Sequence, residues 1–82
     1  MRKINSKLIK ALELEKNGNW DHAHKIVQDI ENRDSCLIHA YLHRKQGDIG
    51  NANYWYSRAG SVMPDKTLAE EWQVLFDKLH TP

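Results

Sequence analysis

Three residues of the types that bind transition metals lie close together near the middle of the chain. Cys36, His39 and His43 are spaced so that they lie along one face of a helix. Cys36 and His43 are nevertheless about 10 Å apart along the axis at ~1.5 Å per residue, which is too far for all three residues to bind one zinc ion. At most two could share an ion, with His24 or Asp48 completing the set from a neighbouring helix.

No Cys-x-x-Cys or His-Glu-x-x-His motif accompanies these residues. Buried polar side chains in proteins normally have hydrogen-bond partners, so cysteine and histidine can occupy positions between helices without any ligand. We therefore expect packed, hydrogen-bonded residues here, with no bound metal and no cofactor.

A second polar group follows along the chain. Asn51, Trp55 and Arg58 share one helix face by their spacing, and Arg44 and Tyr54 are their neighbours in sequence. Amide, indole, guanidinium and phenol groups together suit a planar anion, a sugar or a peptide carboxylate.

A purely structural interpretation of this second group is also consistent with the sequence. It pairs Arg44 with Asp48 along one helix, uses Asn51 in a capping bond and packs Trp55 under the last helix. A catalytic interpretation would make His39 or His43 a general base oriented by Asp48. Because no nucleophile elbow, paired-carboxylate site or phosphate loop supports catalysis, we do not expect an enzyme.

Length and charge limit the choice of fold and partner. The 82 residues suffice for one small domain, residues 1–82, with a single core. The formal net charge of +1 gives no basic field for a nucleic acid, and no apolar stretch approaches the ~20 residues of a membrane span. With one cysteine and no secretory leader pattern, we expect a soluble protein in the reducing cytoplasm.

Glycine, proline and helical spacing of apolar residues predict an all-α fold of about five helices. The expected helices span residues 4–16, 20–31, 36–46, 49–59 and 68–79. Gly18, Gly47 and Gly60 are the expected stops, and Thr67 with Glu70 is an expected capping box for the last helix. The third helix is apolar or semi-polar nearly all round, which places it at the centre.

The second and fourth predicted helices repeat one another at an offset of 29 residues, with Gly18 matching Gly47 and Ala23 matching Ala52. The repeated unit is a helical hairpin, and the second hairpin resembles the tetratricopeptide repeat. The residues that carry this resemblance are Ala40, Gly47, Ala52, Tyr56, Ala59 and Pro64.

The resemblance implies antiparallel hairpins that touch at small residues, closed by a C-terminal capping helix, and a protein that binds peptides. The repeat is degenerate, because Cys36, His39 and His43 occupy large apolar positions of the family pattern. Phrases such as Trp20-Asp21-His22-Ala23-His24 and the stretch 39–60 are also similar to a group of short bacterial proteins of uncharacterised activity.

The apolar faces of the first and third helices leave two arrangements open. Ile4, Leu8 and Leu12 on the first, with Leu37 and Tyr41 on the third, could form a trough for a partner helix or pack on each other.

We therefore expect a module that binds a protein or peptide, which could be a second copy of the chain. The alternative is a protein that binds a small anion, a sugar or a metal in a pocket between the second, third and fourth helices. The candidate ligand- or partner-binding residues for both are His24, His39, His43, Arg44, Asp48, Asn51, Tyr54, Trp55 and Arg58.

Replacing the small residue at the expected helix crossing gives a first prediction. Ala52→Leu should overpack the hairpin and lower the free energy of unfolding by roughly 1 to 3 kcal/mol. Urea denaturation followed by circular dichroism measures this change. An unchanged midpoint would show that Ala52 does not lie at the crossing.

Overall fold

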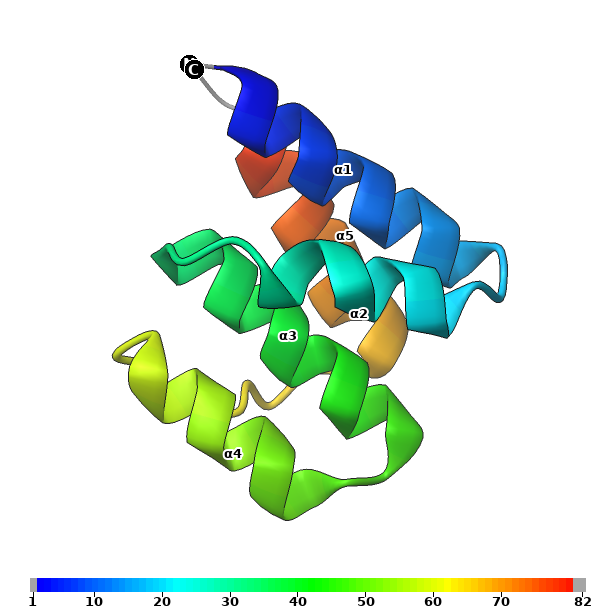
Figure 1. The fold of residues 1–82 in the computed structure, drawn as a ribbon. Helices are drawn as coiled ribbons and strands as arrows, with labels where there is room; N and C mark the ends of the chain where they lie inside the picture. Colours follow the sequence, from blue (N-terminus) through cyan, green and yellow to red (C-terminus); the bar gives the residue numbers. More distant parts are fainter. Residues whose placement is uncertain (1, 81–82) are drawn as a thin grey trace.

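The computed structural model describes residues 2–80, which form five helices and no strand (Figure 1). The all-α prediction is thus confirmed. Met1, Thr81 and Pro82 of the predicted domain 1–82 lie outside the described residues. The helices are α1 (Arg2–Lys16), α2 (Trp20–Gln28), α3 (Arg33–Gln46), α4 (Ile49–Arg58) and α5 (Leu68–His80).

Two helix boundaries between α2 and α3 differ from those expected. α3 begins three residues earlier than predicted because Asn32 caps it, its side-chain oxygen accepting a bond of 2.7 Å from the Ser35 backbone N–H. α2 ends at Gln28, before the predicted residue 31. The buried Ser35 hydroxyl donates to the Val27 carbonyl at 2.7 Å, so a side chain of α3 satisfies the end of α2.

The two hairpin turns use the same hydrogen bonds at the predicted offset. Gly18 and Gly47 have φ angles of +88° and +89°, a left-handed conformation that glycine adopts without steric cost. After α1, the N–H of residue 18 donates to the carbonyl of residue 15, and the N–H of residue 19 donates to the carbonyl of residue 14. After α3, the N–H of residue 47 donates to the carbonyl of residue 44, and the N–H of residue 48 donates to the carbonyl of residue 43. Both turns are therefore the same helix-terminating motif.

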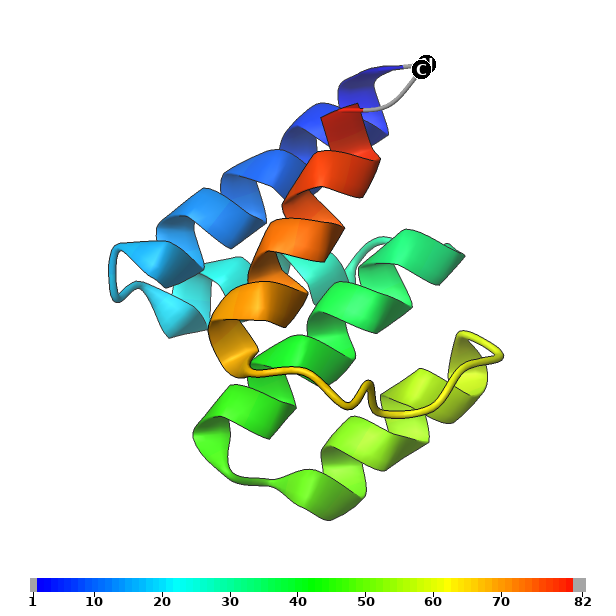
Figure 2. The same cartoon turned by 180° about the vertical axis from the view of Figure 1, so that it is seen from behind.

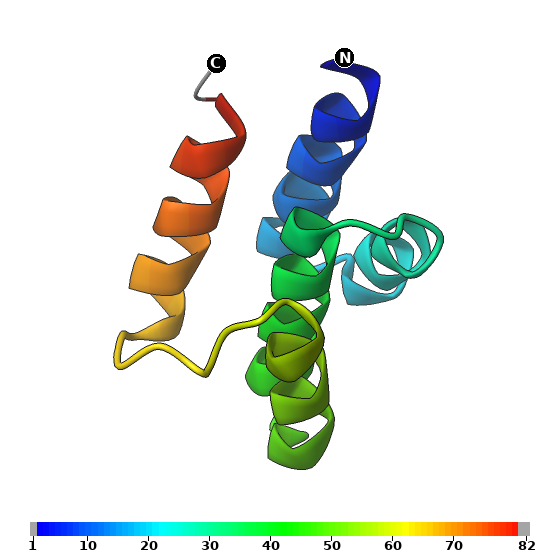
Figure 3. The same cartoon turned by 90° about the vertical axis from the view of Figure 1, so that its left-hand side faces the viewer.

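α3 lies at the centre and contacts all four other helices (Figures 1 and 3). Its Ala40 is fully buried, and so is Ala52 on α4, at 0% exposure each. The predicted central position of α3 is confirmed, and both alanines belong to the core.

α5 runs alongside α1 and packs over α1 and α3 (Figures 2 and 3). It inserts Trp72, Leu75 and Leu79 into the core, and the Trp72 indole N–H donates to the Leu12 carbonyl at 3.0 Å. The apolar faces of α1 and α3 are thus covered by the chain's own last helix. Leu8, Leu12, Leu37 and Tyr41 are all buried, each at 8% exposure or less.

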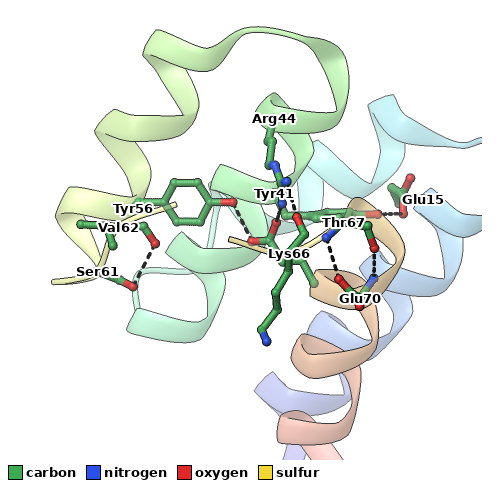
Figure 4. Close-up of polar contacts among 10 residues, drawn as sticks. Glu15, Tyr41, Arg44, Tyr56, Ser61, Val62, Lys66, Thr67 and Glu70 are labelled. Carbon is green, nitrogen blue, oxygen red and sulfur yellow. Dashed lines mark hydrogen bonds and ion pairs between the residues drawn. The ribbon is translucent and has the colours of Figure 1, made fainter. Parts of the chain in front are cut away.

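A buried carboxylate ties α5 to α3 and α4. Glu71, 4% exposed, accepts bonds from Arg44 at 2.7 Å and from the Tyr56 hydroxyl at 2.6 Å. Arg44 also donates to the Lys66 carbonyl in the segment before α5, and Figure 4 shows Arg44 and Tyr56 approaching this point from two helices. Because all these groups are paired, this polar cluster is compatible with burial.

The predicted capping box of α5 is present. The Thr67 N–H donates to Glu70 at 2.8 Å, and the Glu70 N–H donates to the Thr67 hydroxyl at 3.1 Å (Figure 4). The backbone bond lowers the pKa of Glu70 by favouring its charged form. The start of α5 is therefore fixed by its own sequence.

None of the helices between residues 2 and 80 combines the length and apolar character that crossing a bilayer requires.

Removing the buried carboxylate should weaken the attachment of α5. Glu71→Ala leaves Arg44 and the Tyr56 hydroxyl without their partner, so we expect a loss of about 3 kcal/mol in the free energy of unfolding. Tyr56→Phe removes one neutral donor and should cost about 1 kcal/mol. Chemical denaturation measures both changes, with the exposed Glu13→Ala as the control. A loss for Glu71→Ala no larger than that of the control would contradict this role.

Candidate functional site

Three histidines converge where α2 packs against α3. His24 comes from α2, and His39 and His43 come from successive turns of α3. One ring nitrogen from each lies within 4.8 Å of the others. His39 and His43 are buried, at 5% and 8% exposure, whereas His24 is half-buried. The sequence analysis expected either His24 or Asp48 to complete a set of metal ligands, and it is His24 that lies beside His39 and His43.

The histidines are also bonded to one another and to a neighbour. The Nε2 atoms of His24 and His39 are 3.0 Å apart, a hydrogen-bond distance at which one nitrogen donates and the other accepts. Nδ1 of His43 lies 3.3 Å from the Gln46 side-chain oxygen, which can only accept, so this nitrogen carries the proton when the bond forms.

Two tryptophans enclose this group. The Trp55 ring stacks on His39 with ring centres 3.9 Å apart, and the Trp20 ring stacks on His24 at 4.9 Å. The Trp20 indole N–H donates to the Leu42 carbonyl at 2.8 Å, which fixes this ring against α3. The imidazoles of His24 and His39 therefore lie between the Trp20 ring of α2 and the Trp55 ring of α4.

The surroundings favour uncharged imidazoles. Burial lowers the pKa of His39 to about 4, and the nearby His24 and His43 act in the same direction. Burial also lowers the pKa of His24; His43 adds to this effect and Asp21 opposes it. At neutral pH, His24 and His39 are therefore neutral.

An open groove of about 650 Å³ lies beside the histidines, between the C-terminal half of α2, the N-terminal half of α3 and the C-terminal end of α4. We call it the α2–α4 groove. Its apolar lining includes Ile30, Trp55 and Ala59, and its charged lining consists of Arg33, Arg58 and Glu31. This volume is within the range of about 300–1,000 Å³ that is usual for small-molecule sites.

Trp55 and Arg58, two more of the predicted residues, both line this groove. Arg58 lines it, donates to the Tyr54 hydroxyl at 3.1 Å, and places its guanidinium 5.3 Å from the Trp55 ring centre. The bond to Tyr54 raises the pKa of Arg58, so the side chain stays charged.

Arg44, Asp48 and Asn51 lie elsewhere. Arg44 belongs to the buried cluster around Glu71, and the bond to Glu71 raises its pKa. Asp48 is the N-cap of α4 and accepts bonds from the backbone and side chain of Asn51. The expected capping bond is thus present, but the Arg44 to Asp48 pair is replaced by the ion pair with Glu71.

Cys36 and Trp55 also differ from what their spacing suggested. The Cys36 thiol is free and lines the α2–α4 groove with His39, but it is outside the group of three converging histidines. Trp55 packs on His39 rather than under α5.

Sequence reasoning missed three residues of the site: Trp20, Ile30 and Arg33. Trp20 precedes His24 by four residues on one helix face, a spacing that could have indicated the stacked pair. No such signal exists for Arg33, which donates to the Ala59 carbonyl at 2.9 Å across the groove.

Comparison of the chain with protein-family models, with curated proteins and with solved structures found no match.

The neutral state of His39 predicts an acid-sensitive fold. In the unfolded chain the His39 side chain takes up a proton near pH 6.5, whereas in the folded protein burial lowers its pKa to about 4. Stability is therefore complete above about pH 6.5 and is lost progressively as the pH falls towards 4, by up to about 3 kcal/mol from this group. His24, whose pKa is also lowered, adds to the loss.

Urea denaturation between pH 7 and pH 5, with a chelator present, measures this dependence. His39→Gln should flatten it, whereas replacing the exposed His22 on α2 by Gln should leave it unchanged. Equal pH profiles for wild type and His39→Gln would contradict the assignment.

Proposed function

We propose that the protein is a small helical binding module that holds a short segment of a partner protein in the α2–α4 groove. The observation that carries this proposal is the position of Arg58. Its guanidinium lies at an open, partly apolar groove, and no carboxylate among the described residues forms an ion pair with it.

The surroundings of Arg58 favour a ligand with a carboxylate. Contacts with Tyr54 and Trp55 orient the guanidinium, at 5.9 Å and 5.3 Å from the two ring centres. An arginine held in this way can bind a carboxylate through two parallel hydrogen bonds. A peptide that places an acidic group there could place an apolar side chain against Ile30 and Ala59.

The position of α5 favours the α2–α4 groove as the binding site over the apolar faces of α1 and α3, which the sequence analysis also considered. α5 packs over α1 and α3, so their apolar side chains are already covered. A partner helix could reach them only by displacing the buried contacts of Trp72, Leu75 and Glu71. The α2–α4 groove requires no such displacement.

The proposal also includes a degenerate tetratricopeptide-like repeat, a cytoplasmic location and a partner other than nucleic acid. The matching turns at Gly18 and Gly47 support the first, and the free thiol of Cys36 is consistent with the second. The near-neutral charge supports the third.

A small anion or sugar in the same groove is the alternative function. The groove volume of about 650 Å³ would accommodate either, with Arg58 and the Trp55 ring as the contacts. The two functions differ in whether a peptide backbone is required for binding.

Selection from a displayed library of random peptides, with the full chain as bait, tests the proposal. Selected peptides are then measured by fluorescence anisotropy in forms with the acidic group and with the corresponding amide. We expect Arg58→Gln to weaken binding of the acidic form about 10- to 100-fold, since a hydrogen bond to a charged group contributes about 1.5–3 kcal/mol. Lys10→Gln, an exposed change on α1 outside the groove, should have no effect.

Other outcomes separate the alternatives. Concentration-dependent dimers in sedimentation experiments that Arg58→Gln abolishes would identify a second copy as the occupant. A thermal shift with small carboxylates or sugars, without any selected peptide, would support the small-ligand function. No Arg58-dependent peptide and a strictly monomeric chain would contradict the proposal.

A further inference from the structure

We propose that His24, His39 and His43 form a binding site for one zinc ion between α2 and α3. Zinc bonds to imidazole nitrogen at about 2.0–2.1 Å, so two ligands of a tetrahedral ion are about 3.3 Å apart. The nitrogens of these residues lie within 4.8 Å of one another, and those of His24 and His39 are already 3.0 Å apart. Rotation of the half-buried His24 ring could close the remaining gap.

The bond between His24 and His39 indicates where the ion would lie. Two Nε2 atoms point at each other across a single shared proton, so two ring nitrogens converge on one position. An ion bound here would lie beside the line between the two Nε2 atoms, and the ring that now carries the Nε2 proton would bind as its Nδ1–H tautomer, so that each Nε2 donates a lone pair. His43 is close enough to supply the third.

One of the three histidines already has the outer hydrogen bond that is usual for a metal ligand. A ligating imidazole normally donates its other N–H to an oxygen, and Gln46 accepts from Nδ1 of His43 at 3.3 Å. This bond fixes the proton on Nδ1 and leaves Nε2 free to bind. Stacking on Trp20 and Trp55 holds the rings of His24 and His39 in place.

The donor set selects the ion and leaves one coordination position open. Three neutral imidazoles suit zinc and its neighbours in the first transition row, whereas calcium and magnesium prefer oxygen ligands. Three protein ligands leave a fourth position for water or another ligand. The inference does not rest on the proposed peptide binding, although His39 also lines the α2–α4 groove.

Metal titration of the full chain without an affinity tag tests the proposal, since a histidine tag binds the same ions. After treatment with a chelator, Zn²⁺ should bind in a 1:1 ratio by calorimetry. At a free Zn²⁺ concentration about 100-fold above Kd, the Tm should rise by about 10–20 °C. Co²⁺ should give the visible absorption of a tetrahedral site, and Ca²⁺ should produce no shift.

Matched variants identify the ligands. His24→Gln changes the most exposed of the three and should abolish the Zn²⁺-dependent rise in Tm. Replacing His22, exposed on the same helix, by Gln should preserve it, and so should Cys36→Ala, which removes the only thiol. Circular dichroism checks that each variant remains folded.

Wild-type protein alone can overturn the proposal, so it does not depend on the folding of a variant. If the wild-type protein shows no Zn²⁺-dependent rise in Tm and no tetrahedral Co²⁺ spectrum, the proposed site is refuted. Binding lost in Cys36→Ala or in the His22 variant, but kept in His24→Gln, would also refute this ligand set.

Discussion

α3 contacts each of the other four helices, and this enclosure constrains the rest of the structure. A helix enclosed in this way has no solvent-facing side that could accommodate all its polar residues, yet α3 carries two histidines, a tyrosine and an arginine along its length. Each buried polar group must then find a hydrogen-bond partner within the protein. No buried side-chain nitrogen or oxygen in the described chain lacks one.

The two sides of α3 meet this requirement with different chemistry. Towards α5 and α1, charged groups pair: Arg44 with Glu71 of α5 and Lys45 with Glu15 of α1, each carboxylate also accepting from a tyrosine. Burial raises the pKa of both tyrosines, Tyr41 and Tyr56, so they remain neutral donors. Towards α2, neutral imidazoles and indoles replace the ions. The α2–α4 groove adjoins this second side.

The histidines and the groove are two parts of one surface rather than separate features. His39 belongs to both, and Trp55 stacks on His39 while also lining the groove and lying beneath Arg58. Any ligand that moves the Trp55 ring would therefore act directly on the imidazoles. This continuity follows from α4 packing against α3 but not against α2, which leaves a gap beside their C-terminal ends.

The sequence by itself determined the features that depend on near neighbours in the chain: the helices, the glycine turns at residues 18 and 47, the capping box of Thr67 and the central place of α3. The helices, the turns and the capping box rest on contacts within about four residues, and the central place of α3 was indicated by its apolar character on nearly every side. Only the tertiary structure decided that α5 covers α1 and α3, that Arg44 pairs with a carboxylate 27 residues away, and that His24 meets His39. Spacing along one helix shows which residues share a face, but it does not show which helix packs against that face.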